Sequence, residues 1–185
     1  MPGHGNCCRR AGSEDLLGER ARSTSNRGMS HESVRDDLSL RAPDLRIIEV
    51  DQSTATVAEA AKALGVSPGQ IAKTLALRVN DRAMLLVTSG DTRLDNQKAK
   101  LALGGKPRML DPTETLALTG HPVGGVCPFG LATALPIYCD VSLRAHAIVF
   151  PAAGSLTTSV QVAPDRLATL IDAAWVDVCK PPIHS

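Results

Sequence analysis

Aromatic residues are scarce in this chain of 185 residues. Phenylalanine, tyrosine and tryptophan together make up 2% of it, and they are Phe129, Phe150, Tyr138 and Trp175. The hydrophobic core must therefore be built from Leu, Val, Ile and Ala. The scarcity also argues against a surface that binds single-stranded nucleic acid by stacking bases on successive aromatic rings.

An excess of charge of either sign is lacking too. The net charge is +1, from 20 basic and 19 acidic residues. This balance argues against a binding face that is basic over its whole area. Any contact with nucleic acid is therefore expected to be local.

Cysteine pairs of the CxxC type and long apolar runs are also missing. The five cysteines are Cys7, Cys8, Cys127, Cys139 and Cys179. Their spacing supports neither a zinc ribbon nor a thioredoxin-type redox motif, and reduced thiols in a cytoplasmic protein are the simplest interpretation. No apolar run approaches the roughly 20 residues that span a bilayer, and the N-terminus lacks the apolar region of a secretory signal. We therefore expect no membrane partner.

Common catalytic signatures are absent as well. The sequence contains no Walker A loop and no H-E-x-x-H motif. It supplies no obvious nucleophile and no obvious metal site, so we expect no metal and no other cofactor.

The remaining composition is that of a globular protein, with 43% hydrophobic and 21% charged residues. Its length suits one domain with a sizeable core. Residues 1–32 are predicted to be a disordered extension, because the first 28 are polar and rich in Arg, Ser and Gly; Met29 is a possible start. Residues 33–180 are predicted to form the domain, and residues 181–185 a loose tail.

Hydrophobic periodicity and turn residues predict helices and strands that alternate irregularly. The predicted helices cover residues 33–40, 56–64, 94–103, 111–119 and 163–171. The predicted strands cover residues 45–50, 71–79, 84–88, 108–110, 135–140, 147–150, 159–162 and 175–178. Because strict βαβ alternation is absent, the pattern predicts a single α+β domain with a mixed β-sheet and packed helices.

A loop rich in glycine and proline stands between two apolar segments at residues 121–130. Its sequence is His121-Pro122-Val123-Gly124-Gly125-Val126-Cys127-Pro128-Phe129-Gly130. Glycine lets backbone N–H groups approach a ligand closely, and proline stiffens the chain between them. The loop therefore has two interpretations, a shaped binding loop or a tight packed turn. Within it, His121 is either solvated or catalytic, and Cys127 is either a nucleophile or a small packed residue.

Lys73 interrupts an otherwise apolar strand face. Ile71, Lys73, Leu75, Leu77 and Val79 share one side of the predicted strand at a period of two. The lysine either extends to water from the end of the strand or serves as a cation beside a pocket. Together with backbone amides of the glycine loop, it could bind an anion or polarise a carbonyl.

The order and spacing of four segments resemble the YbaK / prolyl-tRNA-synthetase-associated editing domain family. The segments are Ile71-Ala72-Lys73-Thr74-Leu75, Ser89-Gly90-Asp91, Thr119 to Gly130 and Leu135-Pro136-Ile137-Tyr138-Cys139-Asp140. The resemblance covers about residues 45–180, so residues 33–180 are expected to be a YbaK-like editing domain.

The resemblance implies an enzyme that acts in trans. Such proteins hydrolyse the ester that joins a wrong amino acid to the 3′ end of a tRNA, chiefly tRNA(Pro), without a metal. It implies catalytic roles for Lys73 and Gly124. It implies substrate contacts for Thr74, Ser89, Gly90, Gly125, Val126, Pro128 and Ser159. Expected partners are the 3′ end of mischarged tRNA and either prolyl-tRNA synthetase or an elongation factor that presents the tRNA.

The chain departs from the Cys-tRNA(Pro) deacylase branch of that family at two positions. Val50 stands where the branch often has Tyr, and Ser159 stands where it has Asp. The amino acid removed therefore stays open among cysteine, alanine, serine, threonine and non-protein amino acids. Two other functions stay open as well: a non-catalytic module that binds aminoacyl-tRNA or a nucleotide, and a small-molecule esterase that uses Cys127.

Overall fold

The protein is described here by a computed structural model that covers residues 26–181. Its helices are α1 (Asn26–Arg41), α2 (Val57–Leu64), α3 (Asn96–Leu103), α4 (Pro112–Thr119) and α5 (Pro164–Leu170). Its longer strands are β1 (Ile47–Glu49), β2 (Ile71–Val79), β3 (Arg82–Ser89), β5 (Pro107–Met109), β6 (Ile137–Asp140), β8 (Thr158–Val160) and β9 (Ala174–Val176). Three two-residue strands complete the fold: β4 (Arg93–Leu94), β7 (Phe150–Pro151) and β10 (Cys179–Lys180). No helix in this part of the chain is long and apolar enough to cross a membrane.

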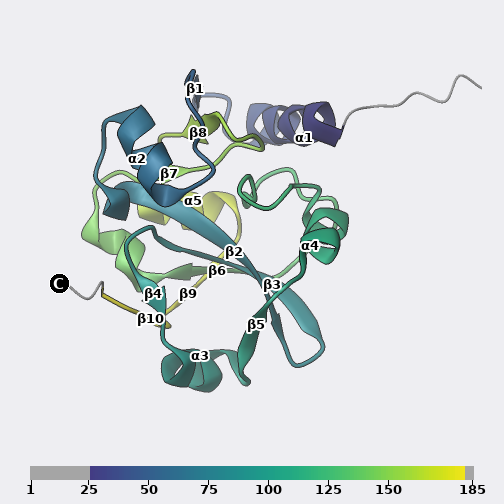
Figure 1. The fold of residues 1–185 in the computed structure, drawn as a ribbon, viewed down its shortest axis with the longest axis vertical. Coiled ribbons are helices and arrows are strands. Elements are labelled where there is room, and N and C mark those ends of the chain that lie inside the picture. The colour runs from purple at the N-terminus through teal and green to yellow at the C-terminus, as the bar shows by residue number, and fades with distance from the viewer. Residues whose placement is uncertain (1–25, 182–185) are drawn as a thin grey trace, which may run out of the picture.

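A six-stranded mixed sheet forms the centre of the molecule (Figure 1). The strand order is β5-β2-β3-β6-β9, and β7 adds to the outer edge of β2. The β2–β3 pair is antiparallel, whereas the β3–β6 and β6–β9 pairs are parallel. The prediction of a single α+β domain with a mixed sheet is therefore confirmed.

The β2–β3 hairpin is the longest element pair, and turn chemistry fixes its register. Val79 pairs with Arg82 across a two-residue turn, in which Asn80 adopts a φ of 53°. Asparagine tolerates this left-handed conformation better than most residues do. The turn therefore aligns Lys73 with Thr88 at the other end of the ladder.

Helix α2 begins at the capping box that the sequence predicts. The Thr56 hydroxyl accepts a hydrogen bond from the Glu59 N–H, and the Glu59 carboxylate accepts one from the Thr56 N–H. The helix ends at Gly65, whose φ is 68°. Its inner side, with Ala60 and Ala61, packs on Ile71 and Phe150. Helix α2 is thus fixed beside the start of β2 (Figure 1).

The core is aliphatic, as the composition predicts. Its largest fully buried side chains are Phe129, Leu77, Leu85, Leu86, Leu143 and Leu167, together with the smaller residues Val34, Val87, Val149, Val160 and Val178 and the polar His121. Among these largest buried side chains of the described residues, Phe129 is therefore the only Phe, Tyr or Trp. It packs with Val34 and Leu38 of α1, so that α1 covers the end of the glycine loop.

Some predicted boundaries are wrong. Helix α1 begins at Asn26, so the disorder predicted for residues 1–32 does not extend over 26–32; residues 1–25 lie outside the described part. The side chains of Val34 and Leu38 explain why a helix forms here, because they bury an apolar stripe against the core. Lys180 belongs to β10 and pairs with Arg93, within the segment 33–180 that was predicted to form the domain. Residues 182–185 lie outside the described part.

Two further segments differ from their prediction. Helix α3 starts two residues later than predicted, because Asp95 caps it through Gln97 and Lys98 and residues 93–94 form β4 instead. The strand predicted for residues 147–150 shortens to Phe150–Pro151. A 3-10 turn at Val141–Ala145 precedes it, capped by Asp140.

Candidate functional site

A cavity of about 550 Å³ opens along one edge of β2. Five segments surround it: the start of α2, strand β2, the β5–α4 connection, the glycine loop and the β7–β8 region. Its lining residues are Thr54, Ala55, Thr56, Val57, Ala60, Ile71, Ala72, Lys73, Thr74, Leu75, Ala76, Met109, Leu110, Pro112, Thr115, Val123, Gly124, Val126, Phe150, Ala152 and Ser159. The wall is mostly apolar with a few polar groups, which is the usual composition of a small-molecule site.

The cavity lies where β2 lacks a neighbouring strand. On this edge, β7 pairs with residues 71–72 and β5 pairs with residues 77–79. Between them, the Ala76 carbonyl accepts a hydrogen bond from the Leu110 N–H at 3.0 Å. Because backbone groups alternate in direction along a strand, the N–H and C=O of Thr74 point to the same open edge as those of Ala76. The backbone of β2 therefore offers hydrogen-bonding groups to the cavity.

Lys73 is half-buried at this edge, and its ammonium is held by the turn that follows β3. Its Nζ donates to the Gly90 carbonyl at 3.0 Å and to the Thr92 carbonyl at 2.5 Å. Burial lowers the pKa of the Lys73 ammonium below its usual value, and the nearby Asp91 carboxylate partly opposes this shift. An ammonium has three N–H donors. Two of them are used by these carbonyls.

Ser89 and Gly90 lie behind Lys73 and do not line the cavity. The Ser89 hydroxyl is 2.7 Å from both the Gly69 carbonyl and the Asp91 carboxylate. A Cβ on Gly90 would lie 2.4 Å from the Pro68 carbonyl oxygen, so only glycine fits there. These two residues therefore shape the turn that receives the lysine.

The glycine loop contributes Val123, Gly124 and Val126 to the cavity wall, whereas Gly125 and Pro128 stand outside it. Gly124 has a φ of 91°, in the region that favours glycine. Gly125 donates its N–H to the Pro122 carbonyl at 2.9 Å. The loop is thus a shaped wall, and its composition of glycine and proline serves its backbone geometry.

His121 and Cys127 hold the loop from within. Both are fully buried, and the His121 Nε2 lies 2.8 Å from the Phe129 carbonyl and 3.5 Å from the Cys127 Sγ. Burial raises the pKa of the Cys127 thiol to about 12 and lowers the pKa of His121. At neutral pH both are therefore uncharged packing residues, and the structure places neither on the cavity wall.

Two hydroxyl groups on the cavity wall add polarity. Thr74 lines the cavity, and its Oγ1 is buried without a hydrogen-bond partner among the described residues. Ser159, on β8, is 4% exposed and also lines the cavity. A buried hydroxyl without a partner costs about 1–3 kcal/mol. Such a group in a cavity wall indicates a place where a ligand or water completes the hydrogen bonding.

The structure brings together five of the residues singled out in the sequence: Lys73, Thr74, Gly124, Val126 and Ser159. It also adds wall residues that the sequence reasoning did not assign, chiefly residues 54–57 and 109–115. The caps at Thr56 and Asp111 could be found in the sequence as helix starts. Nothing in their local pattern says that both starts face one strand edge. Among the described residues, no group of three or more His, Cys, Asp or Glu side chains is placed to hold a metal ion.

Comparisons with known proteins agree with this geometry. The model of the aminoacyl-tRNA editing domain family matches residues 51–170. The uncharacterized protein YwhH of Bacillus subtilis (strain 168) is 43% identical over 154 residues, which are 82% of this chain and 98% of YwhH. A proline–tRNA ligase of Shouchella clausii is 32% identical over 121 residues, which are 65% of this chain and 21% of the ligase.

A solved structure shares the fold. It is described as a candidate trans-editing enzyme for prolyl tRNA synthetase, and it superposes with a TM-score of 0.76 at 36% sequence identity. The match covers 82% of this chain and 97% of that one. The fold is therefore shared over nearly the whole length of that chain.

Proposed function

The chain belongs to the aminoacyl-tRNA editing domain family, and on this premise we propose that it is an aminoacyl-tRNA deacylase that acts in trans. It hydrolyses the ester of a mischarged tRNA and returns a free amino acid and the 3′-hydroxyl of the tRNA. We assign this activity to residues 33–180. The reaction takes place in the cytoplasm, where translation uses charged tRNA.

One observation carries the proposal: Lys73 lines the cavity, and two carbonyls hold its ammonium in place. A positive charge at this point suits the ribose or phosphate oxygens of a tRNA 3′ end. The near-neutral net charge leaves this local contact as the main electrostatic attraction.

The aminoacyl group occupies the apolar part of the cavity between β2 and the glycine loop. Gly124 and Val126 form the steric limit on one side, and Thr74 and Ser159 offer hydroxyl groups on the wall. A wall of this kind favours a small side chain. The substrate is most simply tRNA(Pro) that carries cysteine, alanine or another small amino acid.

Hydrolysis needs no protein nucleophile in this proposal. Water attacks the ester carbonyl, and a backbone N–H of the loop near Gly124 stabilises the oxyanion that forms. The bond to the ribose oxygen then breaks, and that oxygen takes a proton to become the 3′-hydroxyl. Substrate groups held beside the carbonyl assist the water. The buried Cys127 thiol, whose pKa is raised to about 12, makes the alternative of a cysteine esterase unattractive.

The 3′ end of a mischarged tRNA is the partner that the site itself supports. Prolyl-tRNA synthetase or an elongation factor would present the tRNA, because a net charge of +1 gives the chain little overall electrostatic attraction for tRNA. Ser89 and Gly90 support Lys73 rather than touch the substrate, and Gly125 and Pro128 shape the loop.

The experiment is deacylation of tRNA(Pro) charged in turn with Cys, Ala, Ser and Thr. We expect the wild-type protein to release at least one amino acid and Lys73→Ala to lose this activity while it stays folded. Lys100→Ala, which removes an exposed lysine of α3, is the matched control and retains the activity. If no charged tRNA in the panel shows a loss that depends on Lys73, the proposal fails. Saturable binding of a mischarged tRNA without turnover would favour the non-catalytic binding module instead.

A further inference from the structure

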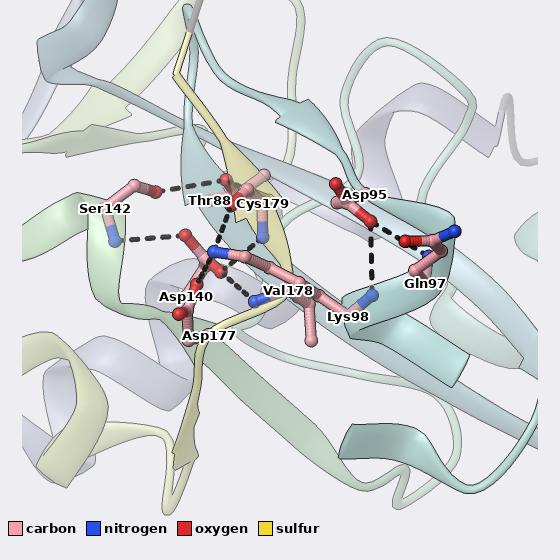
Figure 2. Close-up of polar contacts among 9 residues, drawn as sticks. All are labelled: Thr88, Asp95, Gln97, Lys98, Asp140, Ser142, Asp177, Val178 and Cys179. Atoms are coloured by element: carbon pink, nitrogen blue, oxygen red, sulfur yellow. Dashed lines mark hydrogen bonds and ion pairs between the residues drawn. The ribbon is translucent and has the colours of Figure 1, made fainter. Parts of the chain in front are cut away.

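Figure 2 shows a cluster of hydrogen bonds around Thr88, Asp140 and Cys179, residues that do not line the cavity. We propose that Thr88 and Asp140, which do not line the cavity, are positioning residues that fix the Lys73 ammonium through the turn of residues 89–92. The inference rests on the proposed function for its kinetic consequence. It also predicts a property of the lysine that is measurable without substrate.

The Gly90 and Thr92 carbonyls, which hold Lys73, belong to a turn that is closed by hydrogen bonds of its own. The Thr92 N–H and the Thr92 hydroxyl both donate to the Ser89 carbonyl, at 3.3 and 2.8 Å. These two bonds close the turn and set the direction of the Gly90 and Thr92 carbonyls. A change in the position of Thr92 therefore moves an acceptor of the lysine.

Thr88 connects this turn to the rest of the domain. Its side chain is fully buried, and its Oγ1 lies 2.8 Å from the Thr92 Oγ1, 3.1 Å from the Cys179 Sγ and 3.3 Å from the Ser142 Oγ. The Thr92 hydroxyl proton is already given to Ser89, so Thr88 must donate to Thr92. The lone pairs of Thr88 then accept from the Cys179 thiol and the Ser142 hydroxyl. The Cys179 thiol also meets Thr92 and Asp140, so these side chains form one connected cluster.

Asp140 holds the two residues that meet Thr88 from the other side. Its carboxylate is 1% exposed and accepts from the N–H groups of Ser142 at 3.0 Å, Val178 at 2.8 Å and Cys179 at 3.1 Å (Figure 2). Hydrogen bonds to an ionised group are stronger than those between neutral groups. The C-terminal segment and the 3-10 turn thereby share one hydrogen-bond acceptor, the Asp140 carboxylate.

The C-terminal segment also closes over the turn directly. Strand β10 pairs with β4, which begins at the residue after Thr92. Farther along the same surface, the Lys98 ammonium donates to Asp177 at 2.7 Å. This ion pair is exposed on both sides and contributes little. The buried chain from Asp140 through Cys179, Thr88 and Thr92 to Lys73 is therefore the connection that matters for the lysine.

The position of Thr88 in the sheet also brings its side chain close to that of Lys73. Lys73 and Thr88 are directly opposed in the β2–β3 ladder, so their side chains emerge on the same face. The stem of the lysine thus passes the cluster on its way to the two carbonyls. Loss of the hydroxyl at Thr88 would remove the donor that holds Thr92 while leaving the ladder intact.

The test compares five variants with the wild-type protein. Thr88→Val and Thr92→Val each remove one hydroxyl of the cluster, and Asp140→Asn removes the charge that organises Ser142 and Cys179. Thr88→Ser keeps the hydroxyl. Ala168→Gly, in the buried face of α5, is a destabilised control that does not touch the cluster. Thermal unfolding is measured for each, so that lost stability and lost positioning are separated.

Two readouts are used. The first is the reactivity of the Lys73 amine toward an acylating reagent across pH, followed by peptide mass spectrometry. The second is kcat and KM for the mischarged tRNA that the wild-type protein deacylates. We expect Thr88→Val, Thr92→Val and Asp140→Asn to increase the labelling rate of Lys73 and to lower kcat by roughly tenfold to a hundredfold. Thr88→Ser and Ala168→Gly are expected to stay near the wild-type values of both.

The outcomes separate the two proposals. If the wild-type protein deacylates but Thr88→Val and Thr92→Val keep both kcat and the labelling rate of Lys73, the positioning role is refuted. If the wild-type protein deacylates nothing, the proposed function fails, and the labelling rates alone decide whether the cluster positions the lysine. Should Thr88→Val not fold, Thr92→Val carries the same decision, because it keeps the carbonyl that binds Lys73.

Discussion

Replacement of Gly124 by alanine is the sharpest test of the glycine loop as a wall of the cavity. Gly124 has a φ of 91°, where an L-residue is strained. An added Cβ would find ordinary contacts, with the Leu156 Cδ2 at 3.4 Å and the Ala55 Cβ at 3.6 Å. Because space is available, the cost comes from the backbone alone. For one non-glycine residue in such a conformation it is about 1–2 kcal/mol.

This cost converts into measurable changes. In a domain of this size, 1 kcal/mol lowers Tm by about 2–4 °C, so Gly124→Ala should lower Tm by roughly 2–8 °C. The loop can relieve the strain by a shift of its backbone, and a displacement of about 1 Å at a reacting centre can reduce catalysis by about a hundredfold. We therefore expect kcat/KM for the deacylated tRNA to fall by about tenfold to a hundredfold.

Two other glycines provide controls. Gly104 ends α3 with a φ of 77° and has no atom within 4 Å of an added Cβ, so Gly104→Ala should show the same loss of stability with unchanged kcat/KM. Gly125→Ala adds a methyl group with its nearest contacts at 3.6 Å and no positive φ, so its Tm should stay within about 2 °C of the wild type. If Gly124→Ala loses stability like Gly104→Ala but keeps full kcat/KM, the loop conformation does not shape the active cavity.

Three further predictions follow from Lys73, Cys127 and Thr74. Burial lowers the pKa of Lys73 in the folded protein below the usual 10.5, so between these two pKa values the unfolded chain binds more protons and stability rises with pH. Urea unfolding from pH 8 to 10 should therefore show the wild type gaining stability relative to Lys73→Met. A stability difference between the two proteins that stays constant with pH would contradict the buried position. Because burial raises the pKa of the Cys127 thiol to about 12, the native protein should not be alkylated at Cys127 by iodoacetamide at pH 7.5, and Cys127→Ala should keep kcat within about threefold of wild type, a factor of about 0.7 kcal/mol. Thr74→Val removes a buried hydroxyl without a partner, so it should raise the free energy of unfolding by about 1 kcal/mol while raising KM; an unchanged KM would mean that the hydroxyl does not meet the substrate.

Local signals in the sequence predicted most of the fold. The capping box at Thr56 and Glu59, the turn at Asn80 and the cap at Asp111 each act within a few residues, and a single sequence contains them in full. Boundaries failed where distant contacts decide the outcome. Helix α1 begins at Asn26 although residues 26–32 are mostly polar, because the helix continues from the apolar stripe at Val34 and Leu38.

The site was predictable only in part for the same reason. Lys73 stood out because a charged residue interrupted an apolar period, and the glycine loop stood out by composition. The open edge of β2 could not be foreseen, because it results from β5 and β7 stopping short on either side of residues 73–76. The contribution of Thr88, Asp140 and Cys179 was equally hidden, since 91 residues separate the hydroxyl of Thr88 from the thiol it meets.

The hydrogen bonds of Lys73 favour one of the two interpretations that the sequence left open. A lysine that extends to water needs no fixed acceptors, and the turn at residues 89–92 would then have no reason to point two carbonyls at it. Lys73 has such acceptors: two of its donors are satisfied by Gly90 and Thr92, and the residue lines the cavity. These two bonds hold the ammonium in one place beside the cavity, which is where the proposed substrate would bring a negatively charged or carbonyl oxygen.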